Sequence, residues 1–163
     1  MPVFVNGMAR GSVPPGHPSW MTLARKDALR RADVVVIFGT PLDFRLGYGK
    51  ETHIAEDARL IQVDLDGGEI GRNRAIDVGI VGDTGLVMEQ MTAVARRSGF
   101  RAGSHRAWTE EIRGIDRTRR QATQAEMESD ATPINPVRAC AEIDAVLDAV
   151  SYTHLTLPTI CSV

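Results

Sequence analysis

The sequence predicts an α/β fold built on a doubly wound parallel sheet. Val34 to Phe38 is an unbroken apolar run, rich in β-branched residues, as expected of a strand buried on both faces. Two further apolar runs follow at 60–63 and 76–81, and segments with helical periodicity lie between and after the runs. Strands that alternate with helices favour right-handed parallel crossovers, and hence this class of sheet.

The chain before the central run is expected to form a strand, a loop and a helix. Residues 2–6 (PVFVN) predict a short strand, and the glycine-bracketed loop 7–11 follows it. Residues 12–18 are rich in proline and glycine and should be irregular. Ser19 is the expected N-cap of an amphipathic helix over 20–31, where apolar residues recur at helical spacing.

The chain after the central run alternates loops with short regular elements. A glycine-spaced loop is expected at 46–50, a weakly helical stretch at 51–58 and one helical turn at 69–73. Thr84 is the expected cap of a helix that continues to about Arg97. The apolar side of this helix would carry Leu86, Val87, Met91, Val94 and Ala95.

The stretch from Arg96 to Arg120 is basic. It is interpreted either as a phosphate-binding face or as the solvated side of a helix, and charge runs of this kind favour the solvated face. The inner face of that helix would carry Trp108, Ile112 and Ile115.

A polar, acidic connector at 126–132 follows, punctuated by Pro133. Asn135 is a typical N-cap, and Pro136 suits the first position of a helix that continues to about 147. Because this helix follows a linker, it is expected to open another domain.

The composition excludes several classes of protein. The 163 residues suffice for one domain with a core, the net charge of −2 does not indicate nucleic acid, and the apolar runs are too short to span a membrane. The N-terminus lacks the pattern of a signal peptide, and Cys140 and Cys161 form no metal-binding spacing. A reducing cytoplasm is therefore the expected location.

No dinucleotide fingerprint, P-loop, H-E-x-x-H or G-x-S-x-G motif occurs. What remains is a set of residues that close the predicted strands: Gly7, Gly39, Asp64, Asp66, Gly82 and Asp83. In a parallel sheet these ends share one edge, where glycines let phosphates approach and an acid can accept from ribose hydroxyls. This pattern fits an ADP-containing ligand. The alternative is that glycines and aspartates simply populate turns, and the same alternative holds for the polar turn at 39–45.

Four stretches, in this order, resemble the thiamine-diphosphate-dependent enzyme family: PVFVNGMARG, ADVVVIFGTPLDFRLGYG, RLIQVDLDGGEIGRNRAIDVGIVGD and TPINPVRACAEIDAVL. Within that family the chain is most similar to acetolactate synthase large-subunit-like proteins and 2-hydroxyacyl-CoA lyases. The resemblance implies that residues 1–125 form the Rossmann-like central domain, without its first strand. Residues 126–135 would be a linker, and residues 136–149 the first helix of a truncated diphosphate-binding domain, so that the fold is incomplete at both ends.

The resemblance also implies a set of site residues. Those that would line a site for FAD or ADP are Gly7, Met8, Gly39, Thr40, Asp64, Asp66, Ile70 and Asp83. Asp43 and Arg45 match the first Asp and the Arg of the run Gly-x-Arg-Phe-Asp-Asp-Arg, which places Arg45 at the mouth of the active site. Pro41 and Phe44 depart from that run, which puts acetolactate synthase activity and FAD in question.

The implied function is that of a carboligase, lyase or decarboxylase that acts on 2-oxo acids or 2-hydroxyacyl-CoA, with thiamine diphosphate and Mg²⁺ as cofactors. The full-length protein would be a homodimer or homotetramer. The family's activating glutamate and its Mg²⁺ motif would lie outside this chain, so the 163-residue chain is expected to be inactive. The alternatives are a stand-alone nucleotide-binding module of Rossmann type and a non-binding scaffold domain.

The last residues, 150–163 (VSYTHLTLPTICSV), resemble a translated sequencing adapter, and the gene is expected to be interrupted at Asp148 or Ala149. The alternative is a genuine β-rich C-terminus. No role is therefore assigned to Tyr152, His154 or Cys161.

Overall fold

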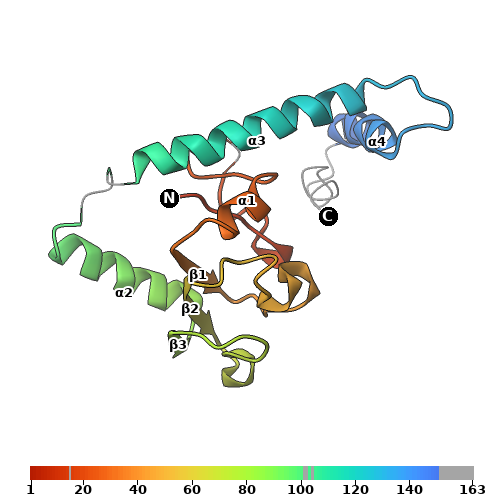
Figure 1. Cartoon of the computed structure of the whole chain (residues 1–163). Coiled ribbons are helices and arrows are strands. Elements are labelled where there is room, and N and C mark those ends of the chain that lie inside the picture. Colours follow the sequence, from red (N-terminus) through yellow and green to blue (C-terminus); the bar gives the residue numbers. More distant parts are fainter. Residues whose placement is uncertain (15, 101–102, 104, 151–163) are drawn as a thin grey trace. The chain divides into compact units, whose positions relative to one another are not determined.

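The computed structural model describes residues 1–14, 16–100, 103 and 105–150 (Figure 1). The chain divides into two compact units. One comprises Lys26–Arg106 and contains the sheet; the other comprises Met1–Arg25 and the chain from Ala107 onward. The adapter-like tail predicted at 150–163 lies outside the described residues except for Val150.

The sheet unit confirms the predicted parallel α/β arrangement. Its strands β1 (Val34–Phe38), β2 (Arg59–Asp64) and β3 (Val78–Val81) lie side by side in chain order and are all parallel (Figure 1). Val36 is in register with Ile61, and Val63 with Ile80. The predicted strands at 34–38 and 60–63 therefore form, and the strand expected at 76–81 begins at Val78.

The core of the sheet unit is aliphatic. Buried side chains alternate with more exposed ones along β1, whereas Leu60, Gln62 and Val63 of β2 are all buried. The other buried hydrophobic residues of this unit are Ala28, Ala32, Val35, Ile37, Leu42, Ile54, Ala58 and Val87. Gln62 is the polar exception in this core, and its amide determines where the next loop lies.

Helix α2 (Thr84–Arg97) follows β3, as expected, and contacts β2. Its N-cap is Asp83 and not Thr84, because the Asp83 carboxylate accepts the Leu86 N–H at 2.9 Å. Val87 is buried, but Leu86, Met91 and Val94 on the predicted apolar side are exposed. The connections at 40–58 and 65–77 contain only the short 3₁₀ segments η2 (Phe44–Gly49) and η3 (Gly67–Glu69), so the weak helix expected at 51–58 does not form.

In the other unit, the prediction of a strand at 2–6 is wrong. Val3 forms a single isolated bridge to Trp20, in which the Val3 N–H donates to the Ser19 carbonyl at 2.7 Å. Residue 20 is therefore extended, and Ser19 caps no helix. The helix expected over 20–31 is reduced to α1 (Arg25–Leu29), because the backbone N–H groups just before it bind a distant carboxylate, described below.

Helix α3 (Arg106–Met127) carries the part of the basic stretch from Arg106 onward. Ile112 is buried as predicted, Trp108 and Ile115 are half-buried, and Thr109 and Asp116 complete the buried face. α3 extends two residues into the segment expected to be a linker. After it, α4 (Pro136–Val150) starts where predicted, because the Asn135 side chain accepts the Val137 N–H at 2.8 Å.

Candidate functional site

The carboxyl ends of the three strands lie at one edge of the sheet. Gly39 follows β1, Asp64 ends β2, and Gly82 and Asp83 follow β3. The ladder continues into these residues, since the Gly39 N–H donates to Val63 O at 2.8 Å and the Gly82 N–H to Asp64 O at 2.9 Å. Gly39 has φ +55, a conformation that favours glycine, and it lies over the start of α2. The sequence therefore identified residues that the fold brings together.

The carboxylates at this edge are partly engaged by the backbone. Asp64 Oδ1 accepts the Asp66 N–H at 3.0 Å, and Asp66 Oδ1 accepts the Gly68 N–H at 2.8 Å. Asp83 Oδ1 accepts the Leu86 N–H, so each of the three carboxylates uses one oxygen in a bond to the backbone. Among the described residues, the second oxygens of these three carboxylates have no hydrogen-bond partner. They can accept from a ligand hydroxyl or amine, whereas the Gly39 and Gly82 amides are already bonded.

The loop after β2 is held by Gln62, which sequence reasoning missed. The buried Gln62 side chain donates from Nε2 to Glu69 O at 3.0 Å and accepts the Gly71 N–H at Oε1 at 2.9 Å. Ile70 lies between these two bonds, and a Cβ on Gly79 of β3 would be 2.5 Å from Ile70 Cγ2. Ile70 is thus packed onto the sheet at Gly79. The signal for Gln62 was present, because it is the polar residue inside the apolar run LIQV.

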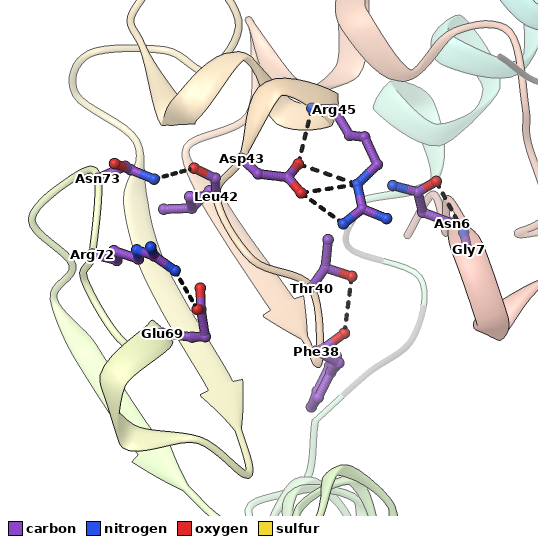
Figure 2. A network of polar contacts seen from close by, with 10 residues as sticks. All are labelled: Asn6, Gly7, Phe38, Thr40, Leu42, Asp43, Arg45, Glu69, Arg72 and Asn73. Carbon is purple, nitrogen blue, oxygen red and sulfur yellow. Dashed lines mark hydrogen bonds and ion pairs between the residues drawn. The ribbon is translucent and has the colours of Figure 1, made fainter.

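The remaining predicted nucleotide residues are Thr40, Gly7 and Met8 (Figure 2 shows the first two). The Thr40 hydroxyl donates to Phe38 O at 3.3 Å. Gly7 and Met8 belong to the other unit, in η1 (Gly7–Ala9), and the Gly7 N–H donates to its neighbour Asn6 at 3.0 Å. Met8 is fully exposed.

Asp43 and Arg45 form a close ion pair in the turn after β1 (Figure 2). Arg45 donates from Nε to both carboxylate oxygens of Asp43, at 3.2 and 3.0 Å, and from Nη2 to Oδ2 at 2.6 Å. Asp43 also caps η2 by accepting the Arg45 N–H at 2.9 Å. The Arg45 guanidinium holds the pKa of the Asp43 carboxyl below its ordinary value, and the same contact raises the pKa of Arg45. Within the described residues, Arg45 Nη1 has no hydrogen-bond partner.

Two further residues of the sheet unit contact this turn and were missed. The Asn73 side chain donates to Leu42 O at 2.8 Å (Figure 2). The Arg74 guanidinium donates to four carbonyls, those of Gly49, Ile54, Ala55 and Glu56. Their partners are backbone carbonyls, and such contacts leave no recognisable pattern of residue types in the sequence. Both residues nevertheless lie within GRNR, part of one of the stretches that resemble the family.

The unit formed by the two ends of the chain has a buried polar cluster of its own. Asp116 Oδ1 accepts the N–H groups of Thr22, Leu23 and Ala24 at 2.9, 2.7 and 3.1 Å. Its Oδ2 accepts from Arg120 Nε at 2.8 Å, and the Arg120 guanidinium stacks 4.6 Å from the Trp20 ring centroid. The carboxylate thereby fills a site that backbone amides would otherwise offer to an outside anion. Arg113 and Arg119 also donate to carbonyls of this unit, those of Pro18 and Leu23, so part of the basic face binds its own chain and is not simply solvated.

The described residues contain no group of three or more His, Cys, Asp or Glu that could hold a metal ion. No described residue is assigned to a metal ion. None of the helices in the described part of the chain combines the length and apolarity needed to span a bilayer.

Comparisons with known proteins agree with this fold. Residues 1–91 match the family described as thiamine pyrophosphate enzyme, central domain. The acetolactate synthase large subunit IlvG of Mycobacterium tuberculosis is 35% identical over 148 residues, which cover 91% of this chain and 26% of that protein. Oxalyl-CoA decarboxylase of Escherichia coli K12 is 31% identical over 147 residues, which cover 90% of this chain and 26% of that protein.

The chain thus spans about a quarter of the length of the curated relatives it matches. The family match covers more than half of the 163 residues, and it disfavours the alternative of an unrelated, stand-alone nucleotide-binding module. This chain belongs to the thiamine pyrophosphate enzyme family.

Proposed function

We propose that the protein containing this chain is a thiamine-diphosphate-dependent carboligase, lyase or decarboxylase that acts on 2-oxo acids or 2-hydroxyacyl-CoA. Family membership and the similarity to an acetolactate synthase and an oxalyl-CoA decarboxylase support this proposal. When bound, thiamine diphosphate supplies the carbanion chemistry. The contribution of this chain would be to bind a nucleotide and to present Arg45 to the substrate.

The nucleotide would be ADP, alone or as part of FAD, at the carboxyl edge of the sheet. The observation that carries this proposal is the set of three carboxylates, Asp64, Asp66 and Asp83, at the edge where parallel sheets bind ligands. Each has one oxygen without a hydrogen-bond partner among the described residues. Such oxygens suit ribose hydroxyls or an adenine amine. Gly39, Thr40 and Ile70 would flank the nucleotide.

Calorimetric titration of the full-length protein with ADP tests this assignment. Asp64→Ala should weaken binding at least about tenfold, since it removes a charged acceptor. Asp57→Ala is the matched control, because Asp57 is an exposed carboxylate two residues before the opposite end of β2. Equal affinity in the Asp64 variant and the wild type would refute the site, and so would a wild type that binds neither ADP nor FAD.

Arg45 is proposed to bind the carboxylate or phosphate of the substrate through the guanidinium face that Asp43 leaves open. Arg45→Ala in the full-length enzyme should lower kcat/KM at least about tenfold. Arg45→Lys should recover only part of the loss, because an ammonium cannot donate as a planar fork. Unchanged kinetics in a folded Arg45→Ala enzyme that still binds thiamine diphosphate would return Arg45 to the role of a surface residue paired with Asp43.

The chain by itself is proposed to be inactive. In the resemblance to the family, no residue of this chain matches the activating glutamate or the Mg²⁺ motif that holds the diphosphate of the cofactor. Purified 1–163 should neither bind thiamine diphosphate in a fluorescence titration nor decarboxylate pyruvate. Cofactor-dependent turnover by the pure chain would contradict this proposal.

A further inference from the structure

We propose that Asn73 and Arg74 are positioning residues that hold the Arg45 turn, which we define as residues 43–50. The substrate role of Arg45 is taken from the proposed function; the positioning itself concerns the turn and is tested separately below. Asn73 and Arg74 are neighbours in the connection between β2 and β3, and they bind the chain on either side of Arg45.

The Arg45 turn has an unfavourable backbone conformation. Gly47, Tyr48 and Gly49 have φ values of 58, 56 and 68°, all in the left-handed region. Tyr48 is the one residue of the three that is not glycine, so its conformation is strained. Such a conformation persists only when its surroundings over-determine it. Inside the turn, the Tyr48 N–H donates to Asp43 O at 2.7 Å. The turn therefore needs further contacts from residues outside it.

Arg74 supplies those contacts at the far side of the turn. Nη1 donates to Gly49 O at 2.9 Å and Ile54 O at 3.2 Å, and Nη2 donates to Ala55 O at 2.7 Å and Glu56 O at 3.0 Å. The Arg74 stem also lies against Gly49, where an added Cβ would be 3.1 Å from Arg74 Cβ. One side chain thus ties the end of the turn to the segment that follows it.

Asn73 supplies the contact at the near side. Its amide donates at 2.8 Å to Leu42 O, the carbonyl directly before Asp43. Leu42 is fully buried, which anchors this end of the turn to the core. Asp43 in turn orients the Arg45 guanidinium through three short bonds. The direction of Arg45 therefore depends on a turn that is held on both sides by consecutive residues of another loop.

The guanidinium is required for this arrangement. Arg74 donates hydrogen bonds to four carbonyls through its planar guanidinium. A lysine would offer a point charge with three donors, and a glutamine would offer a single amide nitrogen. Arg74→Lys should accordingly retain part of the effect, and Arg74→Gln less. Arg72→Gln is the matched control: Arg72 lies two residues away in the same loop, its side chain is 62% exposed, and it pairs with Glu69 and not with the turn (Figure 2).

The direct test is hydrogen–deuterium exchange of the full-length enzyme, read on peptides covering residues 44–56. Several amides there are hydrogen-bonded and should report opening, namely those of Leu46, Tyr48, Lys50, His53, Ile54 and Ala55. Arg74→Gln should raise exchange in this segment at least about fivefold while β1 and β2 keep their protection. Arg72→Gln should not change it. Arg74→Lys keeps the stem against Gly49 and provides the same test if the glutamine variant does not fold.

Kinetics provide the second readout. Because the proposed role of Arg45 is to bind substrate, Arg74→Gln should raise KM severalfold with little change in kcat, and Arg74→Lys should restore part of it. In the Arg45→Ala background the Arg74 substitution should add little, since both act through the same guanidinium. Unchanged exchange at 44–56 in the Arg74 variants overturns the positioning. Raised exchange with unchanged kinetics in both the Arg74 and the Arg45 variants upholds the positioning and refutes the substrate role of Arg45.

Discussion

Removal of the Asp116 carboxylate should strongly destabilise the unit that contains α3. The Asp116 side chain is 5% exposed and accepts three backbone N–H groups and the Arg120 guanidinium. After Asp116→Ala, the buried Ala24 N–H loses its partner entirely, whereas the half-exposed Thr22 and Leu23 amides and Arg120 can partly return to water. A cost of about 3 kcal/mol follows, at the lower end of values for broken buried pairs.

Asp116→Asn gives a finer test. The amide oxygen can still accept the backbone N–H groups, but the charge is lost and an NH₂ group faces Arg120, so the cost should be about 1.5–2 kcal/mol. Urea unfolding followed by tryptophan fluorescence measures this directly, because Trp20 and Trp108, the two tryptophans of the chain, both lie in this unit. Glu126→Gln, an exposed carboxylate on the same helix, should change the free energy of unfolding by less than about 0.5 kcal/mol.

The effect should depend on pH in a defined direction. Burial raises the pKa of Asp116, but the bond from Arg120 and the three backbone N–H groups outweigh it and lower the pKa below its ordinary value. A lowered folded-state pKa gives a stabilisation that is complete above the unfolded pKa of about 4 and is lost as the pH falls through the folded-state pKa. The difference in the free energy of unfolding between wild type and Asp116→Asn should therefore become smaller in acid. A difference that is equal at pH 7 and pH 3, or is negligible at pH 7, would refute the reasoning.

Three further predictions concern local structure. Gln62→Leu should cost about 1–3 kcal/mol, since it leaves backbone groups at 69–71 without partners, and exchange should rise in that loop. Gly47→Ala should lower the free energy of unfolding by more than about 1–2 kcal/mol, because its φ of 58° is unfavourable for alanine and the new Cβ would lie 2.3 Å from the His53 ring. In thermal melts, the double variant with His53→Ala should regain only the part of the stability that is lost to this steric clash. Asn135→Ala should cost α4 about 1 kcal/mol, visible as fraying of its first turn by NMR.

Elements with agreeing local signals could be predicted from the sequence. The strand at 34–38 is a β-branched apolar run closed by a glycine, and it forms at the predicted residues. Helix α4 begins at Pro136 because Asn135 and Pro136 both favour that start. α2 also forms over its predicted range, although its cap is displaced by one residue, since Asp83 and Thr84 are both good caps and only the backbone geometry decides between them.

Elements that depend on distant partners could not be predicted. The periodicity over 20–31 favours a helix, but Asp116, more than 90 residues later, accepts the N–H groups of 22–24, and the helix begins only at Arg25. The same limit applies to the site. The strand-end residues were found because strand ends share an edge in any parallel sheet, whereas Arg74 binds carbonyls that no residue type reveals.

The side-chain amide of Gln62 limits where residues can be inserted into or deleted from the chain. It offers one acceptor and one donor to the backbone at 69–71, the same complement that a neighbouring strand would offer. The eight residues that separate Gln62 from Gly71 therefore form a ring closed by a side chain. An insertion or deletion inside this ring would break at least one of its bonds and lift Ile70 off Gly79. A change of length near the exposed Gly16 would fall in a local turn, closed by the bond from the His17 N–H to Pro14 O at 3.1 Å. We expect natural length variation to be excluded from the first region and tolerated in the second.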